Sequence, residues 1–356
     1  MKRILGLAMI LALLCTACQR EDNKAKADDS FRVLVKSNGK YGYCDKKGKL
    51  VIPAQYENAS LFSEGLAAVR INGKDGYIDA GGKVIIPPSF DSGSIFKDGR
   101  AAVKSGDRWG YIDKTGKRIT ESVYVATFAF TQGVASVIVV DNKSKFKAGF
   151  IDKNGKMVIK PVFDDAKHFS EDLAVVKVGK KYGYIDINGK LHIAAGFDEA
   201  AMFQEGLALV KVNGAYGKVG FIDHSGKMII PAEYDDATSF HEGVAAVQKG
   251  KIWQLIDPSG KPIMKRELGA PTLFSEGLAP VVENKKVGYM DKKGTMVIKA
   301  QYDAGSLFAD GLAPVKVDNK CGFIDRTGTM VIKPQFDWDQ KIIDLYVSYN
   351  ITIKRL

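Results

Sequence analysis

The chain has 356 residues, of which 46% are hydrophobic, and its 52 basic and 41 acidic side chains leave a formal net charge of +11. A positive charge of this size favours long-range attraction to anionic surfaces such as sugar acids, cell-wall polymers and lipid headgroups, although a surface chosen for solubility would look the same. Beyond the N-terminal segment the only cysteines are Cys44 and Cys321. Their slots in the repeat described below place them on opposite faces of a strand, so the fold does not depend on a disulfide.

Residues 1–17 have the pattern of an export signal: Lys2 and Arg3, an apolar run from Ile4 to Leu14, and then small residues. The apolar run is too short to span a bilayer as a mature helix. The segment Leu14-Cys15-Thr16-Ala17-Cys18 resembles a bacterial lipobox. That resemblance implies that Cys18 is lipidated and becomes the mature N-terminus, with an ordinary secretory signal cleaved nearby as the alternative.

Residues 18–30 are polar and almost without large apolar groups, so the segment after Cys18 is expected to form a disordered tether. At about 3.3 Å per residue the tether could hold the folded body up to about 40 Å from the membrane. Its start, Gln19-Arg20-Glu21-Asp22, resembles the surface-export signal of Bacteroidota lipoproteins, and Gln19 is unlike the Asp of the inner-membrane retention signal of enteric bacteria. We therefore expect an outer-membrane protein, anchored through its N-terminal lipid on the periplasmic face or at the cell surface, where nucleic acid is not an expected partner.

From residue 31 the sequence is a tandem repeat, usually 34 residues long. A phrase of Phe, any residue, an acid and Gly begins at Phe62 and recurs at Phe96, Phe130, Phe169, Phe203, Phe240, Phe274 and Phe308, with Gln132 in place of the acid once and Asp172 in place of the Gly once. An Asp-x-x-Gly turn occurs nine times, starting at Asp45, Asp79, Asp113, Asp152, Asp186, Asp223, Asp257, Asp291 and Asp325. Units of this size cannot bury a core alone and must stack on their neighbours.

Alternating and β-branched runs separated by Gly, Asp and Asn predict strands. Each unit is expected to hold three: a small-residue strand such as Leu66 to Ile71, a Gly-aromatic strand such as Gly76 to Asp79, and a Val/Ile strand such as Lys83 to Ile86. No helix is expected after the signal. Insertions of about five residues near 141–146 and about three near 215–218 both fall at the hairpin between the first two strands, an edge where repeat proteins often place partner contacts.

These residues resemble the WG-repeat, or KWG-repeat, family of bacterial proteins from Phe31 to about Asp337. Trp109-Gly110 is the one intact Trp-Gly pair, and elsewhere the Trp slot holds Tyr41, Asp75, Ala148, Tyr182, Val219, Trp253, Val287 and Cys321. The surrounding frame of Gly, an aromatic, Ile and Asp-x-x-Gly-Lys carries the resemblance. The family implies a β-repeat architecture and no common activity.

The repeated aspartates are interpreted as turn caps, because each turn supplies one Asp where a calcium loop gathers several oxygens. The recurring Phe is interpreted as core between units. The Trp slot is aromatic only in odd copies, so Tyr41, Trp109, Tyr182 and Trp253 are candidate partner-binding residues, with structural packing as the alternative. The four histidines share no metal-ligand spacing and no catalytic motif appears, so we expect a non-enzymatic protein with no metal and no cofactor.

The tail, residues 339–356, departs from the repeat. Its apolar residues alternate from Leu345 to Ile353, which predicts a terminal strand that caps the last unit. Residues 31–338 are then expected to form an all-β array of nine three-stranded antiparallel units in an open, curved or superhelical solenoid. The alternative is a closed β-propeller; because blades usually have four strands and propellers at most eight blades, the open form is favoured.

The expected function is that of a non-enzymatic, lipid-anchored cell-envelope protein whose repeat surface binds a protein or a glycan. Two alternatives remain open. The protein could be a structural element that binds anionic cell-wall polymer, or an accessory subunit of a surface uptake or secretion complex.

Overall fold

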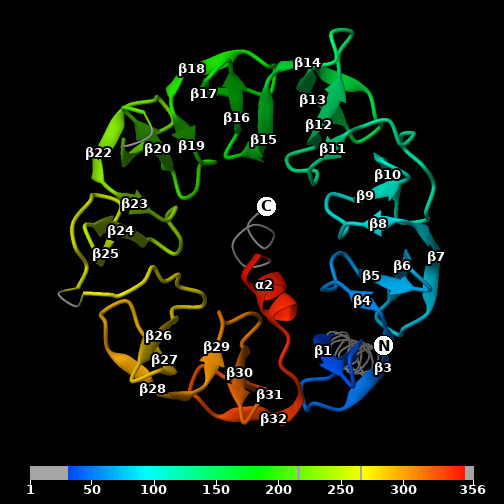
Figure 1. Ribbon diagram of the computed structural model, residues 1–356, viewed down its shortest axis with the longest axis vertical. Helices are drawn as coiled ribbons and strands as arrows, with labels where there is room; N and C mark the ends of the chain where they lie inside the picture. The colour runs from blue at the N-terminus through cyan, green and yellow to red at the C-terminus, as the bar shows by residue number, and fades with distance from the viewer. Residues whose placement is uncertain (1–30, 215–216, 265–266, 349–356) are drawn as a thin grey trace, which may run out of the picture.

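The computed structural model describes residues 31–214, 217–264 and 267–348. Its strands form nine small antiparallel sheets that stand as blades around one axis and close into a ring (Figure 1). The predicted signal peptide, Cys18 and the tether lie outside the described residues. Among the described residues, no helix has the length and apolar character needed to cross a membrane.

Each blade is built from consecutive strands, ordered from the axis outward. The inner strands are mostly two residues long: β4 (Asn58–Ala59), β8 (Ser92–Gly93), β11 (Ala126–Thr127), β15 (Asp165–Ser170), β19 (Glu199–Ala200), β23 (Asp236–Ala237) and β29 (Ala304–Gly305). The second strands are β1 (Val33–Ser37), β5 (Leu66–Ile71), β9 (Arg100–Ser105), β12 (Val134–Val140), β16 (Leu173–Val178), β20 (Ala208–Val212), β24 (Ala245–Lys249), β26 (Ala279–Glu283) and β30 (Ala313–Val317).

The third strands are β2 (Lys40–Cys44), β6 (Lys74–Asp79), β10 (Arg108–Asp113), β13 (Phe146–Asp152), β17 (Lys181–Ile185), β21 (Lys218–Ile222), β25 (Ile252–Ile256), β27 (Lys286–Met290) and β31 (Lys320–Ile324). The outer strands are β3 (Leu50–Tyr56), β7 (Val84–Phe90), β14 (Met157–Phe163), β18 (Leu191–Phe197), β22 (Met228–Tyr234), β28 (Met296–Tyr302) and β32 (Met330–Asp337). Blades 1 to 9 follow chain order, beginning with β1-β2-β3 and ending with β29-β30-β31-β32. The three predicted strands are present in most blades, and five sheets gain the short inner strand as a fourth.

The core lies between the blades, as the repeat length predicts. Apart from Phe62, the recurring Phe is buried in every copy. Its ring packs against the third strand of the preceding blade, on an aromatic residue in every case except Phe274, which packs in the same core as Leu255. In blade 5, for example, the Tyr184 ring lies with its centroid 4.9 Å from that of Phe203 in blade 6. The Tyr184 hydroxyl also donates a 2.8 Å hydrogen bond to the carbonyl of Ala201. The prediction that the Phe column fills the core is confirmed.

The expectation of an open solenoid is wrong, because the last blade contacts the first through the same kind of bonds that join most neighbouring blades. Within the array Asp91 accepts from Lys74 of its own blade at 2.5 Å and from the Gly106 N–H of the next blade at 2.7 Å. We call the junction between blade 9 and blade 1 the seam. There Asp337 of blade 9 makes the same two bonds, accepting from Lys320 at 3.2 Å and from the Gly39 N–H of blade 1 at 3.1 Å.

A second contact at the seam also repeats the regular junction. At most junctions the Gly of the Asp-x-x-Gly turn packs closely on an Ile or Met of the preceding blade. Gly48 of blade 1 packs in the same way on Ile332 of blade 9. With the seam joined in this way, the nine sheets complete a circle. The protein is therefore a nine-bladed β-propeller.

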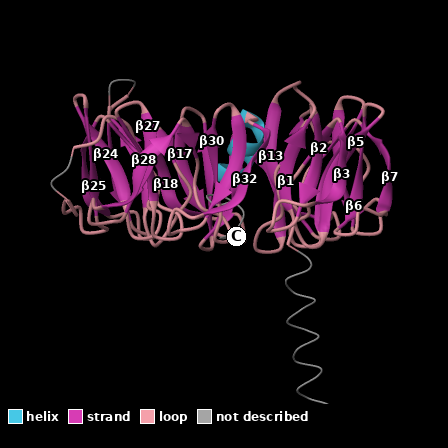
Figure 2. Cartoon of the chain, turned by 90° about the horizontal axis from the view of Figure 1, so that it is seen from below, coloured by secondary structure: helices cyan, strands magenta, loops and turns pink. Residues whose placement is uncertain are grey.

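The two edges of the ring carry different turns (Figure 2). We call the edge with the hairpins between second and third strands, such as residues 37–40 and 71–74, the hairpin rim. The opposite edge, which carries the Asp-x-x-Gly turns and the turns after the inner strands, is the turn rim. Each Asp caps its own turn as predicted: Asp152 Oδ1 accepts 2.9 Å bonds from the N–H groups of Asn154 and Lys156.

The acids that follow the recurring Phe do more than shape their own turns. Glu64, for example, has a φ of 53°, in the left-handed region, and its carboxylate reaches the next blade. There it accepts the Gly99 N–H at 3.0 Å. Glu242 does the same with the Gly277 N–H at 2.9 Å. Burial alone would raise the pKa of Glu242, but the backbone N–H bonds and the nearby Lys292 outweigh it and hold that pKa below its usual value.

The predicted terminal strand is absent over residues 340–348, which form the helix α2 (Gln340–Ser348); the rest of the predicted strand lies outside the described residues. The helix forms because Asp339 caps it, with Oδ1 accepting the Ile342 N–H at 3.2 Å. Its buried residues Ile342, Ile343 and Tyr346 follow a helical spacing. The helix lies inside the ring at the seam, where blade 1 shows no inner strand among the described residues (Figure 1).

Candidate functional site

The insertion near residues 141–146 lengthens one hairpin of the hairpin rim. Strands β12 and β13 pair over seven residues each, up to Val140 opposite Phe146. Asp141 caps the tip in the same way as the repeat turns, accepting from the N–H groups of Lys143 and Lys145 at 2.8 Å. The hairpin is thus a formed structural element that extends the rim of blade 4.

Apolar side chains at this hairpin are exposed. Phe146 is 60% exposed and Val140 is 41% exposed. Ala148, two residues after Phe146, is buried in the core shared with blade 5, so Phe146 lies toward that blade. Val178 of the blade 5 hairpin is 44% exposed and lies two residues after Val176 of the same core. The three side chains therefore lie on the hairpin rim, at the junction between blades 4 and 5. We call Val140, Phe146 and Val178 the rim cluster.

Basic side chains surround the rim cluster. Lys147 pairs with Asp164 at 2.6 Å, and the other oxygen of Asp164 accepts the Gly179 N–H at 2.7 Å, which ties the two hairpins together. The bond from Lys147 and the Gly179 N–H hold the pKa of Asp164 below its usual value. Lys143, Lys145 and Lys180 are exposed beside these groups. The surface thus combines apolar contact area with a positive charge.

The four candidate aromatics occupy equivalent places at alternating junctions, and the ring does not bring them together. Tyr41 and Trp253 are buried, while Trp109 and Tyr182 are half-buried. Tyr41 donates to Asp339 at 3.3 Å, so it takes part in closing the seam. Tyr182 lines a cavity of about 380 Å³ between blades 5 and 6. Packing accounts for much of this column, and its role in partner binding stays a prediction.

Burial favours the neutral forms of Cys44, Cys321 and His168. Burial raises the pKa of the thiols of Cys44 and Cys321 to about 12, and burial lowers the pKa of His168 to about 4, with a smaller contribution from Lys167. A protonated thiol is a poor nucleophile. Among residues 31–214, 217–264 and 267–348, no three His, Cys, Asp or Glu side chains gather in a way that could hold a metal ion.

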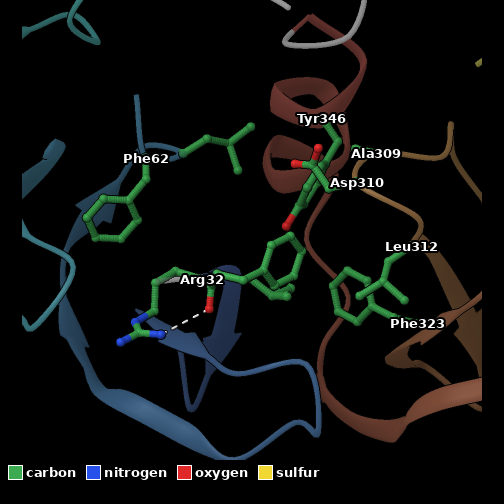
Figure 3. Close-up of a pocket in the computed structure, with 10 residues that line it drawn as sticks. Arg32, Phe62, Ala309, Asp310, Leu312, Phe323 and Tyr346 are labelled. Atoms are coloured by element: carbon green, nitrogen blue, oxygen red, sulfur yellow. Dashed lines mark hydrogen bonds between the residues drawn. The ribbon is translucent and has the colours of Figure 1, made fainter. Parts of the chain in front are cut away.

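A second candidate site lies at the seam, on the turn rim (Figure 3). A cavity of about 230 Å³ is lined by aromatic and aliphatic side chains of blades 1, 2 and 9 and of α2, among them Phe62, Leu312, Phe323 and Tyr346. Asp310 also lines it. Sequence reasoning missed this cavity because it depends on ring closure.

These features define a β-propeller scaffold with surfaces suited to binding. Its repeats match the family described as the WG containing repeat over residues 41–74, 76–109, 109–143, 149–182, 182–216, 220–253, 288–321 and 322–338. The chain belongs to this family, which confirms the resemblance seen in the sequence. No curated protein matches the chain.

Several solved structures are similar at low identity. A structure described as "Crystal structure of the eukaryotic initiation factor" is 13% identical, covers 74% of this chain and 93% of its own, and has a TM-score of 0.42. Hsv2p of Kluyveromyces lactis is 10% identical over 66% of this chain and 92% of its own, with a TM-score of 0.41. The dihydro-heme d1 dehydrogenase NirN is 14% identical over 86% of this chain and 73% of its own, with a TM-score of 0.46. At these values the similarity says nothing about activity.

Proposed function

We propose that this protein is a non-enzymatic binding scaffold of the cell envelope, tethered to the outer membrane through a lipid on Cys18. Its partner is a protein or a glycan held on the hairpin rim. The observation that carries the proposal is the rim cluster, where Phe146 is 60% exposed on a hairpin that the repeat itself does not require. An exposed aromatic side chain in an apolar patch is a typical anchor of a binding surface.

The direction of strand β1 supports this choice of rim. Strand β1 begins at Val33 near the turn rim and ends at the hairpin that follows Ser37. A lipid-anchored segment preceding Phe31 therefore joins the body at the turn rim. The hairpin rim is then free of the attachment, so a large partner can reach it.

The anchor can be tested in intact cells. Replacing Cys18 with Ser should release the protein from the outer membrane fraction, because a thioether-linked lipid cannot form on a hydroxyl. The measurement is the distribution of the protein between membrane and soluble fractions, followed by protease treatment of intact cells with a periplasmic protein as control. Digestion of the repeats would place the scaffold at the cell surface, and protection would place it on the periplasmic face. If C18S stays in the membrane fraction, the lipid anchor is wrong.

Binding at the rim cluster can be tested by photo-crosslinking. Position 146 is changed to p-benzoylphenylalanine, which keeps an exposed aromatic ring, and position 187 serves as control because Ile187 is 46% exposed on the turn rim. We expect a discrete crosslinked product from position 146, lost when Val140 and Val178 are changed to Ser. Equal products from both positions, or none from position 146, would refute the hairpin rim as the binding surface.

The exposed lysines beside the rim cluster favour one second candidate function, binding of anionic cell-wall polymer. Such binding would depend on charge summed over many side chains and would fall steeply with salt. It would also survive replacement of Phe146 by Ser. Retention on purified cell wall at low and high salt therefore separates the two functions.

A further inference from the structure

The cavity of about 380 Å³ between blades 5 and 6 lies toward the hairpin rim. Tyr182, which lines it, is the second residue of β17, and Lys211, which also lines it, is the fourth of the five residues of β20. Strand β17 begins and strand β20 ends at the hairpin rim. The lining includes β19, the strand of blade 6 nearest the axis (Figure 1). The volume falls within the range of about 300–1,000 Å³ that is usual for small-molecule pockets.

One part of the lining is aromatic and apolar. Tyr182 is half-buried and packs against the core between blades 5 and 6. Lys177 of the same blade stands over its ring, with the Nζ atom 5.3 Å from the ring centroid, which helps to hold the ring in place. Leu209 and Val210 add aliphatic surface. The cavity therefore offers a flat ring with a polar tip beside aliphatic side chains.

Polar side chains of both signs form the rest of the lining. The Lys167 ammonium donates to the carbonyl of Ala200 at 2.9 Å, which uses one of its three N–H donors. Lys211 pairs with Glu199 at 3.1 Å. Asp236 supplies a second carboxylate from blade 7. The two ammonium groups and the two carboxylates balance in charge, so the lining combines donors and acceptors without a net charge.

The equivalent cavity between blades 2 and 3 is smaller, about 210 Å³. In the slot of Tyr182 it has Asp75, which is bound by Arg70 at 2.7 Å. Lys341 and Leu345 of α2 also line it. The cavity between blades 5 and 6 thus has an aromatic ring where its equivalent has an ion pair, and it is the larger of the two.

A second difference concerns the residue two positions before the recurring Phe. Blades 2, 3 and 7 have Ser60, Ser94 and Thr238 there, and each hydroxyl accepts an N–H of its own blade's second strand at 2.9 or 3.0 Å. Blade 6 has Ala201, which lines the cavity. A methyl group where other blades carry a hydroxyl leaves room at this point for a hydroxyl of a ligand.

We propose that the cavity between blades 5 and 6 binds one pyranose unit of a neutral saccharide. The C–H face of a pyranose is apolar and can pack on the ring of Tyr182, and its hydroxyl groups both donate and accept hydrogen bonds. They can therefore accept from Lys167 and Lys211 and donate to Glu199 and Asp236. A phosphate or a sugar acid would instead meet two carboxylates. The site shares no residue with the rim cluster and binds its ligand whether or not that cluster holds a partner.

The test uses the full chain and the methyl β-glycosides of glucose, galactose, mannose and N-acetylglucosamine, followed by saturation-transfer NMR. We expect at least one glycoside to receive saturation on the C–H protons of one ring face. Sorbitol, which has the hydroxyl groups but no ring, should receive none. Binding of none of the four glycosides, or equal binding of sorbitol, would overturn the proposal. Tighter binding of methyl β-glucuronide than of methyl β-glucoside would also overturn it, because the cavity would then select anions.

Variants locate the binding. Tyr182→Ala should weaken it by about tenfold or more, and Tyr182→Phe, which keeps the ring, should retain it. Ala201→Thr introduces the side chain that Thr238 has in the same slot of blade 7, so it should fill the cavity in a way that the fold already accommodates. Ser94→Thr is the matched change in blade 3 and should leave binding intact, with thermal unfolding used to confirm that all four variants are folded. Binding that survives either Y182A or A201T, or that is lost in S94T, would refute this cavity as the site.

Discussion

Replacing Gly183 with Ala should destabilise the protein by about 1–3 kcal/mol and loosen the outer strand of blade 5. A Cβ atom at Gly183 would lie 2.6 Å from the carbonyl oxygen of Ile193 and 2.8 Å from the backbone nitrogen of Ala195, both in β18. Because the clashing atoms are backbone, no side chain can rotate away, and the outer strand must move. Chemical denaturation gives the free energy of unfolding, and hydrogen exchange shows whether the amides of β18 lose protection selectively.

The control for this prediction is Gly196, in the same outer strand. A Cβ there meets nothing closer than 4.0 Å, and the residue has no left-handed φ, so Gly196→Ala should be neutral or slightly stabilising. If G183A is no more destabilising than G196A, the close approach of the outer strand is not what the repeated Gly provides.

The pairing of the third and outer strands explains why most repeats carry Gly before an aromatic. In blade 5 Tyr182 pairs with Phe197 and Tyr184 pairs with Ile193, so the outer strand has two extra residues opposite Gly183. The extra residues bulge across the third strand and need a position without a side chain. Blade 7 has Gln254 at this position, and among the described residues it shows isolated bridges in place of an outer strand.

Blade 3 shows that this Gly is required but not sufficient. It keeps Gly110, yet its outer segment also forms only isolated bridges in the described structure. There the Oγ1 of Thr120 accepts the Tyr111 N–H at 3.0 Å, in place of a continued strand ladder. A polar side chain that takes over a backbone bond can thus end a strand that the repeat pattern predicts.

Much of the local structure could be predicted because it depends on neighbouring residues. The strands, the Asp-capped turns and the buried Phe column follow from alternation, turn chemistry and the need to stack. Ring closure could not be predicted in this way, because it depends on a small rotation repeated between blades. Only with the ring closed does Asp337 meet Gly39, 298 residues away in the sequence.

The relative position of the two cysteines could not be predicted from one repeat either, because it too depends on ring closure. Cys44 and Cys321 do lie on opposite faces of their strands, as the repeat slots predict. In a closed ring, however, one face of blade 1 meets the other face of blade 9, and both residues enter the same core at the seam. They stand at different ends of their strands: Cys321 is the second residue of β31 and Cys44 the last of β2.

Replacing Tyr346 with Ala should cost about 3–5 kcal/mol, the usual range for removing a large buried aromatic side chain, and should open the ring at the seam. Tyr346 is 9% exposed and packs in the core that joins blade 9 to blade 1, and burial raises the pKa of its hydroxyl. At the other eight junctions the chain runs continuously from blade to blade, whereas the seam is held by side chains and α2. Loss of Tyr346 should therefore act at the seam before the rest of the ring.

Hydrogen exchange can separate seam opening from general destabilisation. In Y346A the amides of β1 and β32 should exchange faster than those of blades 4 to 6, because an opened ring exposes the two terminal blades while the middle blades keep both neighbours. Asp344→Ala is the control, since Asp344 lies exposed on the same helix and its change should leave the seam intact. Equal acceleration in all nine blades would mean that the ring unfolds as one unit and that α2 does not hold the ring closed at the seam. No acceleration at β1 and β32 would mean that the bonds of Asp337 to Lys320 and Gly39 close the ring without the helix.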